Sequence, residues 1–198
     1  MDIEVYQLKV TFTEPILGTQ PQKDVATEYT QIKAREKGLP VEDELETLPE
    51  MLDKGTTAFH KLDGQPIYYD YHLKGFLKEA GSVLNGTHGV RALRSKVDNT
   101  VFVQPRRILL HLPEGGEMSF LERPLRAQTM QGPRVSLARS EVLPVATRLE
   151  AIVQVIAGPI SESILRELLD YGQFKGFGQW RNGGYGRFTY ELSPVQPG

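Results

Sequence analysis

The stretch from Lys175 to Phe188 decides the fold, and it reads Lys-Gly-Phe-Gly-Gln-Trp-Arg-Asn-Gly-Gly-Tyr-Gly-Arg-Phe. Its glycines are Gly176, Gly178, Gly183, Gly184 and Gly186. Because glycine loses the most conformational freedom on folding, so dense a run needs a close approach or a backbone that side chains forbid. The residues interleaved with these glycines are Trp180, Arg181, Tyr185 and Arg187. Such side chains stack on bases and hold phosphates, but a hairpin turn with core aromatics explains the composition equally well.

The spacing within this stretch is more informative than its composition. An apolar-Gly-apolar-Gly segment, a short polar insert and a Gly-aromatic-Gly segment lie between an expected helix and the expected last strand. This spacing resembles the glycine-rich loop of the RAMP superfamily, the RNA-binding proteins of CRISPR effector complexes. In that family the loop follows the second helix of a ferredoxin-like fold and lies against the RNA. The resemblance therefore implies that the five glycines contact RNA.

The composition is that of an ordinary globular protein, with 198 residues of which 39% are hydrophobic and 24% charged. We expect a single domain over residues 1–198. The chain has no cysteine, which excludes disulfides, thiolate metal sites and a thiol nucleophile. It also has no His-x-His, Asp-x-Asp or Glu-x-x-His cluster, so we expect no metal and no cofactor. With no leader pattern and no apolar run near the ~20 residues of a membrane span, we expect a cytoplasmic protein without a membrane segment.

The net charge of −2 is distributed unevenly along the chain. Residues 1–84 carry 9 basic and 15 acidic residues (9 − 15 = −6), residues 85–148 carry 10 and 5 (+5), and residues 149–198 carry 4 and 5 (−1). A basic middle segment suggests a surface for a polyanion, whereas the acidic segment 36–53 suggests a contact with a protein partner. The alternative in both cases is an ordinary solvated surface.

The hydrophobic pattern predicts alternating strands and helices. The N-terminal part is expected to form a strand at 3–13 with an irregularity near Tyr6, a helical insertion at 20–55 and a hairpin around Asp63-Gly64. A helix at 72–84 with Asp70 as N-cap follows, then a basic linker at 85–99 and a strand at 100–112 broken at Gln104-Pro105. The C-terminal part is expected to form a hairpin of 121–130 and 134–143, a strand at 146–156, a helix at 161–171 capped by Ser161, and a strand at 185–192. This order is an α+β, ferredoxin-like βαββαβ fold (RRM-like, as in RAMP proteins). Its insertions are an acidic one at about 20–70 and a basic β-hairpin at about 113–145.

Two further resemblances concern other parts of the chain. Lys74-Gly75 is similar to the Lys-Gly pair that begins the first helix of RAMP backbone subunits, although Tyr-Asp-Tyr-His precedes it here instead of Pro-Gly-Ser-Ser. The whole chain is also similar to small proteins of phages and prophages, which share the run from Tyr69 to Ala80, the Arg-Pro-Leu-Arg stretch and the Gly-Gln-Trp-Arg-Asn core. This second resemblance implies no activity, and it places the protein in a bacterial or phage-infected cell.

Together these observations favour a RAMP-like protein that binds nucleic acid without catalysis, either a backbone subunit or a phage-encoded relative. The partner is single-stranded RNA or DNA, with RNA favoured, and a homo-oligomer or filament on nucleic acid is an open option. The expected contact residues are the five glycines with Lys74, Arg106, Arg107, Arg123, Arg126, Arg134, Trp180, Arg181, Tyr185 and Arg187.

Two alternatives remain open. The first is a phage protein that docks on, or mimics, a subunit of a host CRISPR complex. The second is a metal-independent endoribonuclease, because a histidine that titrates near neutrality can act as general acid or base. Its candidate groups are His72 with Lys74, His60 with Tyr68, and Asp24 in the loop after the first strand.

Overall fold

The main sheet of this mixed α+β protein has four strands. The computed structural model describes residues 2–20, 56–129 and 132–195. The sheet contains β1 (Ile3–Phe12), β6 (Val101–Gln104), β10 (Arg148–Ile156) and β11 (Phe188–Pro194). Its strand order is β11-β1-β10-β6, and every neighbouring pair is antiparallel.

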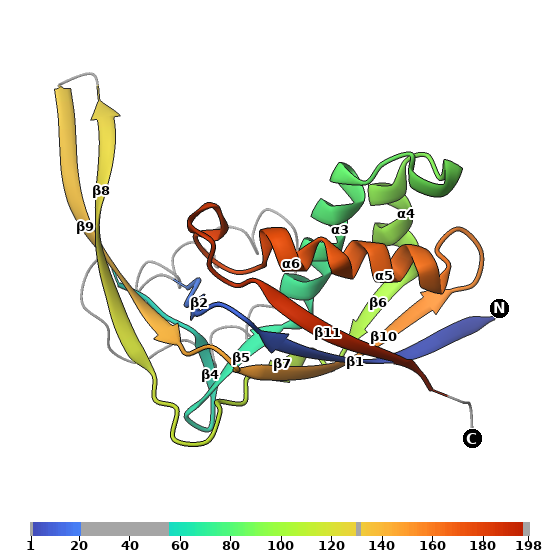
Figure 1. Ribbon diagram of the computed structural model, residues 1–198, viewed down its shortest axis with the longest axis horizontal. Helices are drawn as coiled ribbons and strands as arrows, with labels where there is room; N and C mark the ends of the chain where they lie inside the picture. Colours follow the sequence, from blue (N-terminus) through green and yellow to red (C-terminus); the bar gives the residue numbers. More distant parts are fainter. Residues whose placement is uncertain (1, 21–55, 130–131, 196–198) are drawn as a thin grey trace, which may run out of the picture.

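Helices cover one face of this sheet (Figure 1). In the chain, α3 (Asp70–Val83) lies between β1 and β6, whereas α5 (Glu162–Asp170) and the short α6 (Gly172–Lys175) lie between β10 and β11. Both long helices bury an apolar stripe at the expected helical spacing: Leu73, Phe76, Leu77 and Ala80 in α3, and Ile164, Leu165, Leu168 and Leu169 in α5. Ser161 caps α5 as expected and accepts the Ile164 N–H at 3.4 Å, but the N-cap of α3 is Tyr69 rather than Asp70.

Strand β1 is regular, so the predicted irregularity near Tyr6 is wrong. Its register with β10 is unbroken from Ile3 opposite Ile156 to Thr11 opposite Arg148. Tyr6 lies on the core face, where its hydroxyl donates to Glu4 at 2.7 Å. The alternation of core residues therefore begins at Tyr6 and not at Val5, because an aromatic ring can be buried while its polar tip finds a partner.

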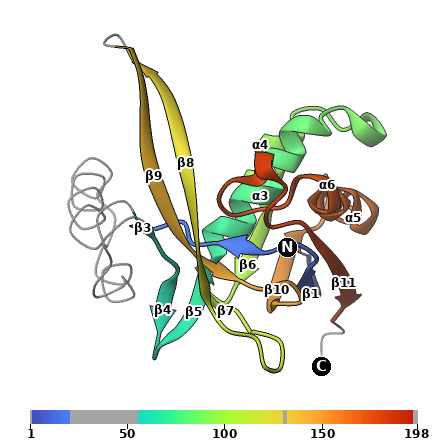
Figure 2. The same ribbon diagram turned by 60° about the vertical axis from the view of Figure 1, so that its left-hand side comes forward.

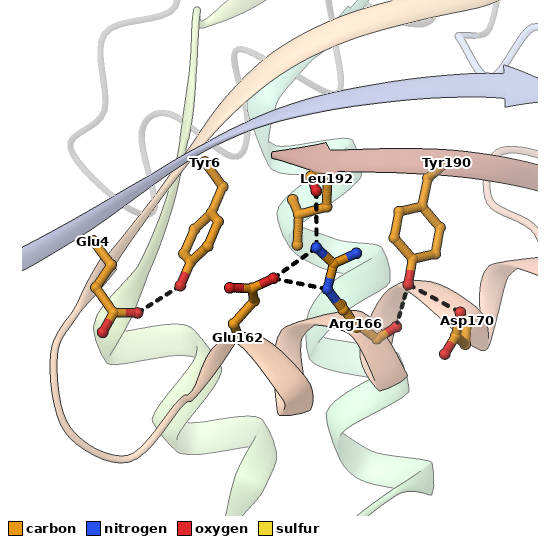
Figure 3. Close-up of polar contacts among 7 residues, drawn as sticks. All are labelled: Glu4, Tyr6, Glu162, Arg166, Asp170, Tyr190 and Leu192. Atoms are coloured by element: carbon orange, nitrogen blue, oxygen red, sulfur yellow. Dashed lines mark hydrogen bonds and ion pairs between the residues drawn. The ribbon is translucent and has the colours of Figure 1, made fainter. Parts of the chain in front are cut away.

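Polar contacts tie α5 to β11, the two elements that flank the glycine-rich loop (Figure 3). Arg166 forms an ion pair with Glu162 at 2.6 Å and donates to the Leu192 carbonyl at 2.9 Å. The Tyr190 hydroxyl lies 3.0 Å from both the Arg166 carbonyl and the Asp170 carboxylate. These contacts fix α5, which leads into the loop through α6, against β11, which follows the loop.

A second sheet contains β4 (His60–Leu62), β5 (Gln65–Tyr69) and β7 (Arg107–Leu109), in that order. The predicted hairpin at Asp63-Gly64 joins β4 to β5, and both turn residues have positive φ (49° and 80°). The strand predicted at 100–112 does break at Gln104-Pro105 as expected, but its two halves are not one strand, because β6 joins the main sheet and β7 joins this one. One alternating pattern does not reveal that its two halves pair with different neighbours.

The third sheet carries a long hairpin that projects from the molecule (Figures 1 and 2). Its strands are β8 (Ser119–Thr129) and β9 (Gly132–Leu143), in the region where the sequence predicts a hairpin. The base of β9 pairs with β2 (Ile16–Leu17) and with β3 (Thr56–Thr57). This pairing connects the hairpin to the segment that follows β1.

The basic segment 85–99 is not a linker, contrary to the prediction. It contains η1 (Thr87–Gly89) and all but the last residue of α4 (Leu93–Thr100). Helix α4 packs on α3 through Leu93 and Val97. A Cβ on Gly81 would lie 3.2 Å from the Arg94 Cα, so glycine lets the two helices approach closely. With only two buried residues, α4 has too weak an apolar pattern to be predicted from sequence.

The predicted helical insertion at 20–55 lies outside the described residues, apart from Gln20 at its edge. The same holds for Asp24 and for the acidic segment 36–53. Within the described ranges, the helices are all too short or too polar to cross a bilayer.

Candidate nucleic-acid interface

The glycine-rich loop folds back on itself. The Phe177 N–H donates to the Gly186 carbonyl at 3.1 Å, and the Gly186 N–H donates to the Pro15 carbonyl at 2.9 Å. A Cβ on Gly186 would lie 2.0 Å from the Phe177 oxygen, and one on Gly176 would lie 2.5 Å from the Gly186 carbonyl. These two glycines are therefore required by the close approach of two backbone segments, whatever the loop binds.

The other three glycines surround the aromatic residues of the loop. Gly178 has a φ of +99° and lies against the Tyr68 hydroxyl. A Cβ on Gly183 would lie 3.0 Å from the Trp180 indole, whereas one on Gly184 would meet only the Arg187 guanidinium at 3.8 Å. Gly184 is thus the glycine of this loop with the most open surroundings.

Trp180 is held in an unusual conformation. Its φ of 53° and ψ of 40° are left-handed, a region that bulky residues rarely occupy and that costs roughly 1–3 kcal/mol. The indole is 41% exposed and stacks on Tyr185, with ring centroids 5.1 Å apart and an interplanar angle of 16°. Strained residues of this kind cluster at functional sites, so the exposed Trp180 and the half-buried Tyr185 form a candidate stacking surface.

Arg123, from β8, lies on the same indole. Its guanidinium carbon is 4.2 Å from the centroid of the Trp180 ring. The residue is only 8% exposed, and its Nε and Nη1 atoms make no hydrogen bond. Burial accordingly lowers the pKa of Arg123. We call Arg123, Trp180 and Tyr185 the stacked cluster, and it joins the hairpin to the glycine-rich loop.

An open pocket of about 530 Å³ lies beside the stacked cluster. It is lined by Glu14, Pro15, Arg187 and the segment from Asn182 to Tyr185. The Arg187 guanidinium is exposed and forms no ion pair with any residue that the structure describes. Among the described residues of this lining, Glu14 is acidic and Arg187 is basic, next to glycine backbone.

Arg181 points to another pocket. It forms an ion pair with Glu79 of α3, so its charge is compensated within the protein. Together with His72, Gly75 and Phe177 it lines a pocket of about 290 Å³ on the α3 side of the loop. The structure therefore separates Arg181 from Arg187, which the sequence analysis grouped together.

Lys74, Arg106 and Arg107 lie outside the stacked cluster. The Lys74 ammonium donates to the Asp98 carbonyl at 2.9 Å and to the Val101 carbonyl, at the C-terminal end of α4. Desolvation lowers the pKa of Lys74, while nearby Asp98 opposes this shift. Arg106 pairs with Asp70 at 3.4 Å, and Arg107 lies on β7 opposite Tyr69. Arg126 and Arg134 are placed by backbone pairing, opposite Val135 and Ala127.

The candidate histidines are buried or engaged. His72 Nδ1 accepts the Tyr69 N–H at 3.0 Å, and Nε2 lies 3.5 Å from Thr19 Oγ1. Burial lowers the pKa of His72 to about 4, so at pH 7 the ring is neutral rather than the imidazolium that a general acid would need. His60 is buried with its ring edge-on to Tyr69, and burial raises the pKa of Tyr68. In the described residues, no group of three or more acidic or histidine side chains is placed to hold a metal.

Sequence reasoning missed the residues that hold the loop from below. Gln179 Oε1 accepts hydrogen bonds from Thr57 Oγ1 at 3.0 Å and from Ser140 Oγ at 3.1 Å. These side chains come from β3 and β9, so the loop is attached to the base of the hairpin. Small polar residues show no periodicity from which such contacts could be predicted. The one local signal near this area is Glu14-Pro15, which ends the first strand and whose Pro15 carbonyl accepts the Gly186 N–H.

Three comparisons place the chain among known proteins. No family model matches the sequence, and no curated protein is similar to it in sequence. A chain from the cryo-EM structure of the Type III-B Cmr-beta complex bound to cognate target RNA superposes with a TM-score of 0.52 and 8% sequence identity. The superposition covers 98% of this chain and 61% of that chain, so this protein corresponds to only part of its length.

A chain of a Type IV-B CRISPR complex superposes with a TM-score of 0.46 and 13% identity over 96% of this chain and 90% of that one, a score too low to carry an argument. These comparisons lend no support to the resemblance to phage and prophage proteins. At 8% identity the Cmr superposition concerns the fold alone. The chain shares its overall fold with a chain of that CRISPR complex.

Proposed function

We propose that this protein binds single-stranded nucleic acid, preferably RNA, where the glycine-rich loop meets the base of the β8–β9 hairpin. The stacked cluster is the observation that carries this proposal. Trp180 and Tyr185 offer aromatic surface, and Arg123 adds a cation that forms no ion pair with an acidic side chain in the described part of the chain. Aromatic residues beside arginines form the sites at which proteins hold unpaired bases and their phosphates.

The electrostatics beside the stacked cluster favour a phosphate. Arg187 lines the open pocket and forms no ion pair with a described residue, and Gly183 and Gly184 let a ligand approach the backbone there. Glu14 lies on the same pocket and opposes an anion. Arg123, in the adjacent stacked cluster, adds a second positive charge close by. We therefore expect a phosphate to bind here with a modest affinity that depends on salt.

The fold supports the preference for RNA and for a role within an assembly. The order of the elements β1, α3, β6, β10, α5 and β11, with a sheet order of β11-β1-β10-β6, is consistent with a ferredoxin-like, RAMP-type domain. The Cmr structure with which it shares this fold is a complex bound to target RNA. We therefore extend the proposal to a subunit of a CRISPR-type complex. The proposal includes no catalytic step, because the lone pair of His72 Nδ1, which a general base would use, already accepts the Tyr69 N–H.

Binding of a labelled single-stranded RNA, followed by fluorescence anisotropy at low salt, tests the proposal. We expect Arg187→Gln to weaken binding about five- to tenfold, as the loss of one charge-assisted contact does. Arg91→Gln is the matched control, because Arg91 is also exposed but lies between η1 and α4, beyond the C-terminal end of α3. Wild-type protein that binds no RNA at low salt would refute the proposal, and so would equal losses in the two variants.

A further inference from the structure

A second pocket lies on the α3 side of the glycine-rich loop, apart from the stacked cluster. Its volume is about 290 Å³, and its aromatic walls are Tyr71 and Phe76 of α3 and Phe177 of the loop. The ion pair between Glu79 and Arg181 closes one side of it. Because Arg181 follows Trp180 directly in the chain, one loop turn borders both the stacked cluster and this pocket.

Gly75, in the lining of this pocket, has no structural reason to be glycine. It lies inside α3, where glycine costs roughly 1 kcal/mol relative to alanine. Its φ is not positive, and a Cβ at this position would meet none of the described residues within 4 Å beyond the backbone of its own helix. Gly81 of the same helix is different, because its Cβ would press on the backbone of α4. What the missing Cβ of Gly75 does provide is open space in the pocket.

The polar groups of this pocket are neutral donors and acceptors. Since His72 Nδ1 accepts the Tyr69 N–H, the ring proton is on Nε2, which faces Thr19 Oγ1 at the long distance of 3.5 Å. The low pKa of His72, about 4, keeps that ring uncharged at neutral pH. The charges of Glu79 and Arg181 cancel each other. A site with aromatic walls, neutral hydrogen-bonding groups and no net charge suits a flat heteroaromatic ring better than a phosphate.

We infer that this pocket binds a nucleobase, turned out of the strand that the stacked cluster holds. The inference rests on the proposed function, and it adds that one base of the bound strand lies in the pocket beside α3. Trp180 of the stacked cluster and Arg181 of the pocket are neighbours in the chain, so a strand that contacts one passes close to the other. Unpaired nucleotides are splayed out and read in this manner by proteins that recognise single strands.

Filling the pocket from Gly75 tests the inference. Gly75→Leu places a side chain in the open space and should weaken binding of single-stranded RNA by at least about fivefold, as loss of one bound base does. Since no phosphate contact is removed, the salt dependence of binding should be unchanged. Gly75→Ala, a smaller change, should raise the thermal midpoint of unfolding while it weakens binding less. Ser82→Ala, on the exposed part of the same helix, is the control and should bind like wild type.

A second ligand separates this inference from the proposed function. An oligonucleotide of the same length with abasic sugars has the phosphates but no base for the pocket, so wild type and Gly75→Leu should bind it equally. The inference is overturned if Gly75→Leu binds RNA as tightly as wild type does, or if the substitution weakens binding of the abasic strand as much as binding of RNA. Either result leaves the proposed function intact. Wild-type protein that binds neither strand overturns the proposed function as well.

Discussion

At the scale of single residues, Arg123 is a buried side chain with unsatisfied hydrogen-bond donors. It is buried on the Trp180 indole, yet two of its nitrogens make no hydrogen bond. A buried charge without a partner costs free energy, whereas its contact with the indole returns roughly 0.5–2 kcal/mol. The two contributions offset one another in the free protein, and a bound phosphate would remove the cost.

Arg123→Met should therefore separate stability from binding. We expect its free energy of unfolding, measured in urea, to stay within about 1 kcal/mol of wild type, while RNA affinity falls. Arg181→Met is the matched comparison, because it leaves Glu79 without its partner and should lower stability by about 1 kcal/mol. An Arg123→Met protein as destabilised as Arg181→Met would mean that Arg123 has a structural partner.

His72 makes the stability of the fold depend on pH. Its pKa falls from 6.5 in the unfolded chain to about 4 in the folded protein, chiefly through desolvation. Between these values the unfolded state binds more protons, so the contribution of the neutral ring is complete above pH 6.5 and is lost as the pH falls toward 4. The loss amounts to up to about 3 kcal/mol.

Urea unfolding at neutral pH and near pH 5 measures this effect. Wild type should be less stable at the lower pH, and His72→Gln should lose less stability between the two. His111→Gln is the control, because His111 is exposed and should follow wild type. A wild-type stability that is flat over this range would contradict the burial of a neutral His72.

At the scale of elements, the glycine-rich loop combines structural and open positions. Gly186 and Gly184 both have positive φ, but only Gly186 is pressed against another backbone segment, at the Phe177 carbonyl. Gly186→Ala should thus destabilise the protein by more than about 2 kcal/mol, and Gly184→Ala by only about 1–2 kcal/mol from backbone strain. Thermal unfolding distinguishes the two, and equal losses would mean that the loop does not close as described.

At the scale of the whole molecule, the projecting hairpin and the helical layer meet at the glycine-rich loop (Figures 1 and 2). Arg123 and Arg187 are the two cations of this junction that we expect to contact phosphate. Each phosphate contact on a single strand contributes about −0.7 to the slope of log affinity against log salt, so two contacts predict a slope of roughly −1.4.

Titrations of RNA over a range of salt concentrations measure that slope. A value near zero would contradict phosphate binding at the junction. A value several times steeper would mean that cations outside the junction contribute, and Arg106→Gln, at the distant β6–β7 connection, would identify one of them.

How much of the site could be predicted from the sequence varied with the range of the interaction. The Gly and aromatic residues of the loop were recognisable, because their spacing is local. The roles of Lys74 and Arg181 were not, because each depends on a partner from another element, the end of α4 and Glu79 of α3. An arginine that pairs within the protein and one that forms no ion pair with a described residue, such as Arg187, look the same in a sequence.

By itself, the sequence determined the helices α3 and α5, the cap at Ser161, the turn at Asp63-Gly64 and the positions of the loop glycines. Each follows from periodicity, capping or backbone freedom within a few neighbouring residues. Only the tertiary structure decided that residues 100–112 split between two sheets, that α4 packs on α3, and that Arg123 reaches Trp180. These outcomes depend on which segments lie side by side, and local patterns of burial do not carry the identity of the neighbour.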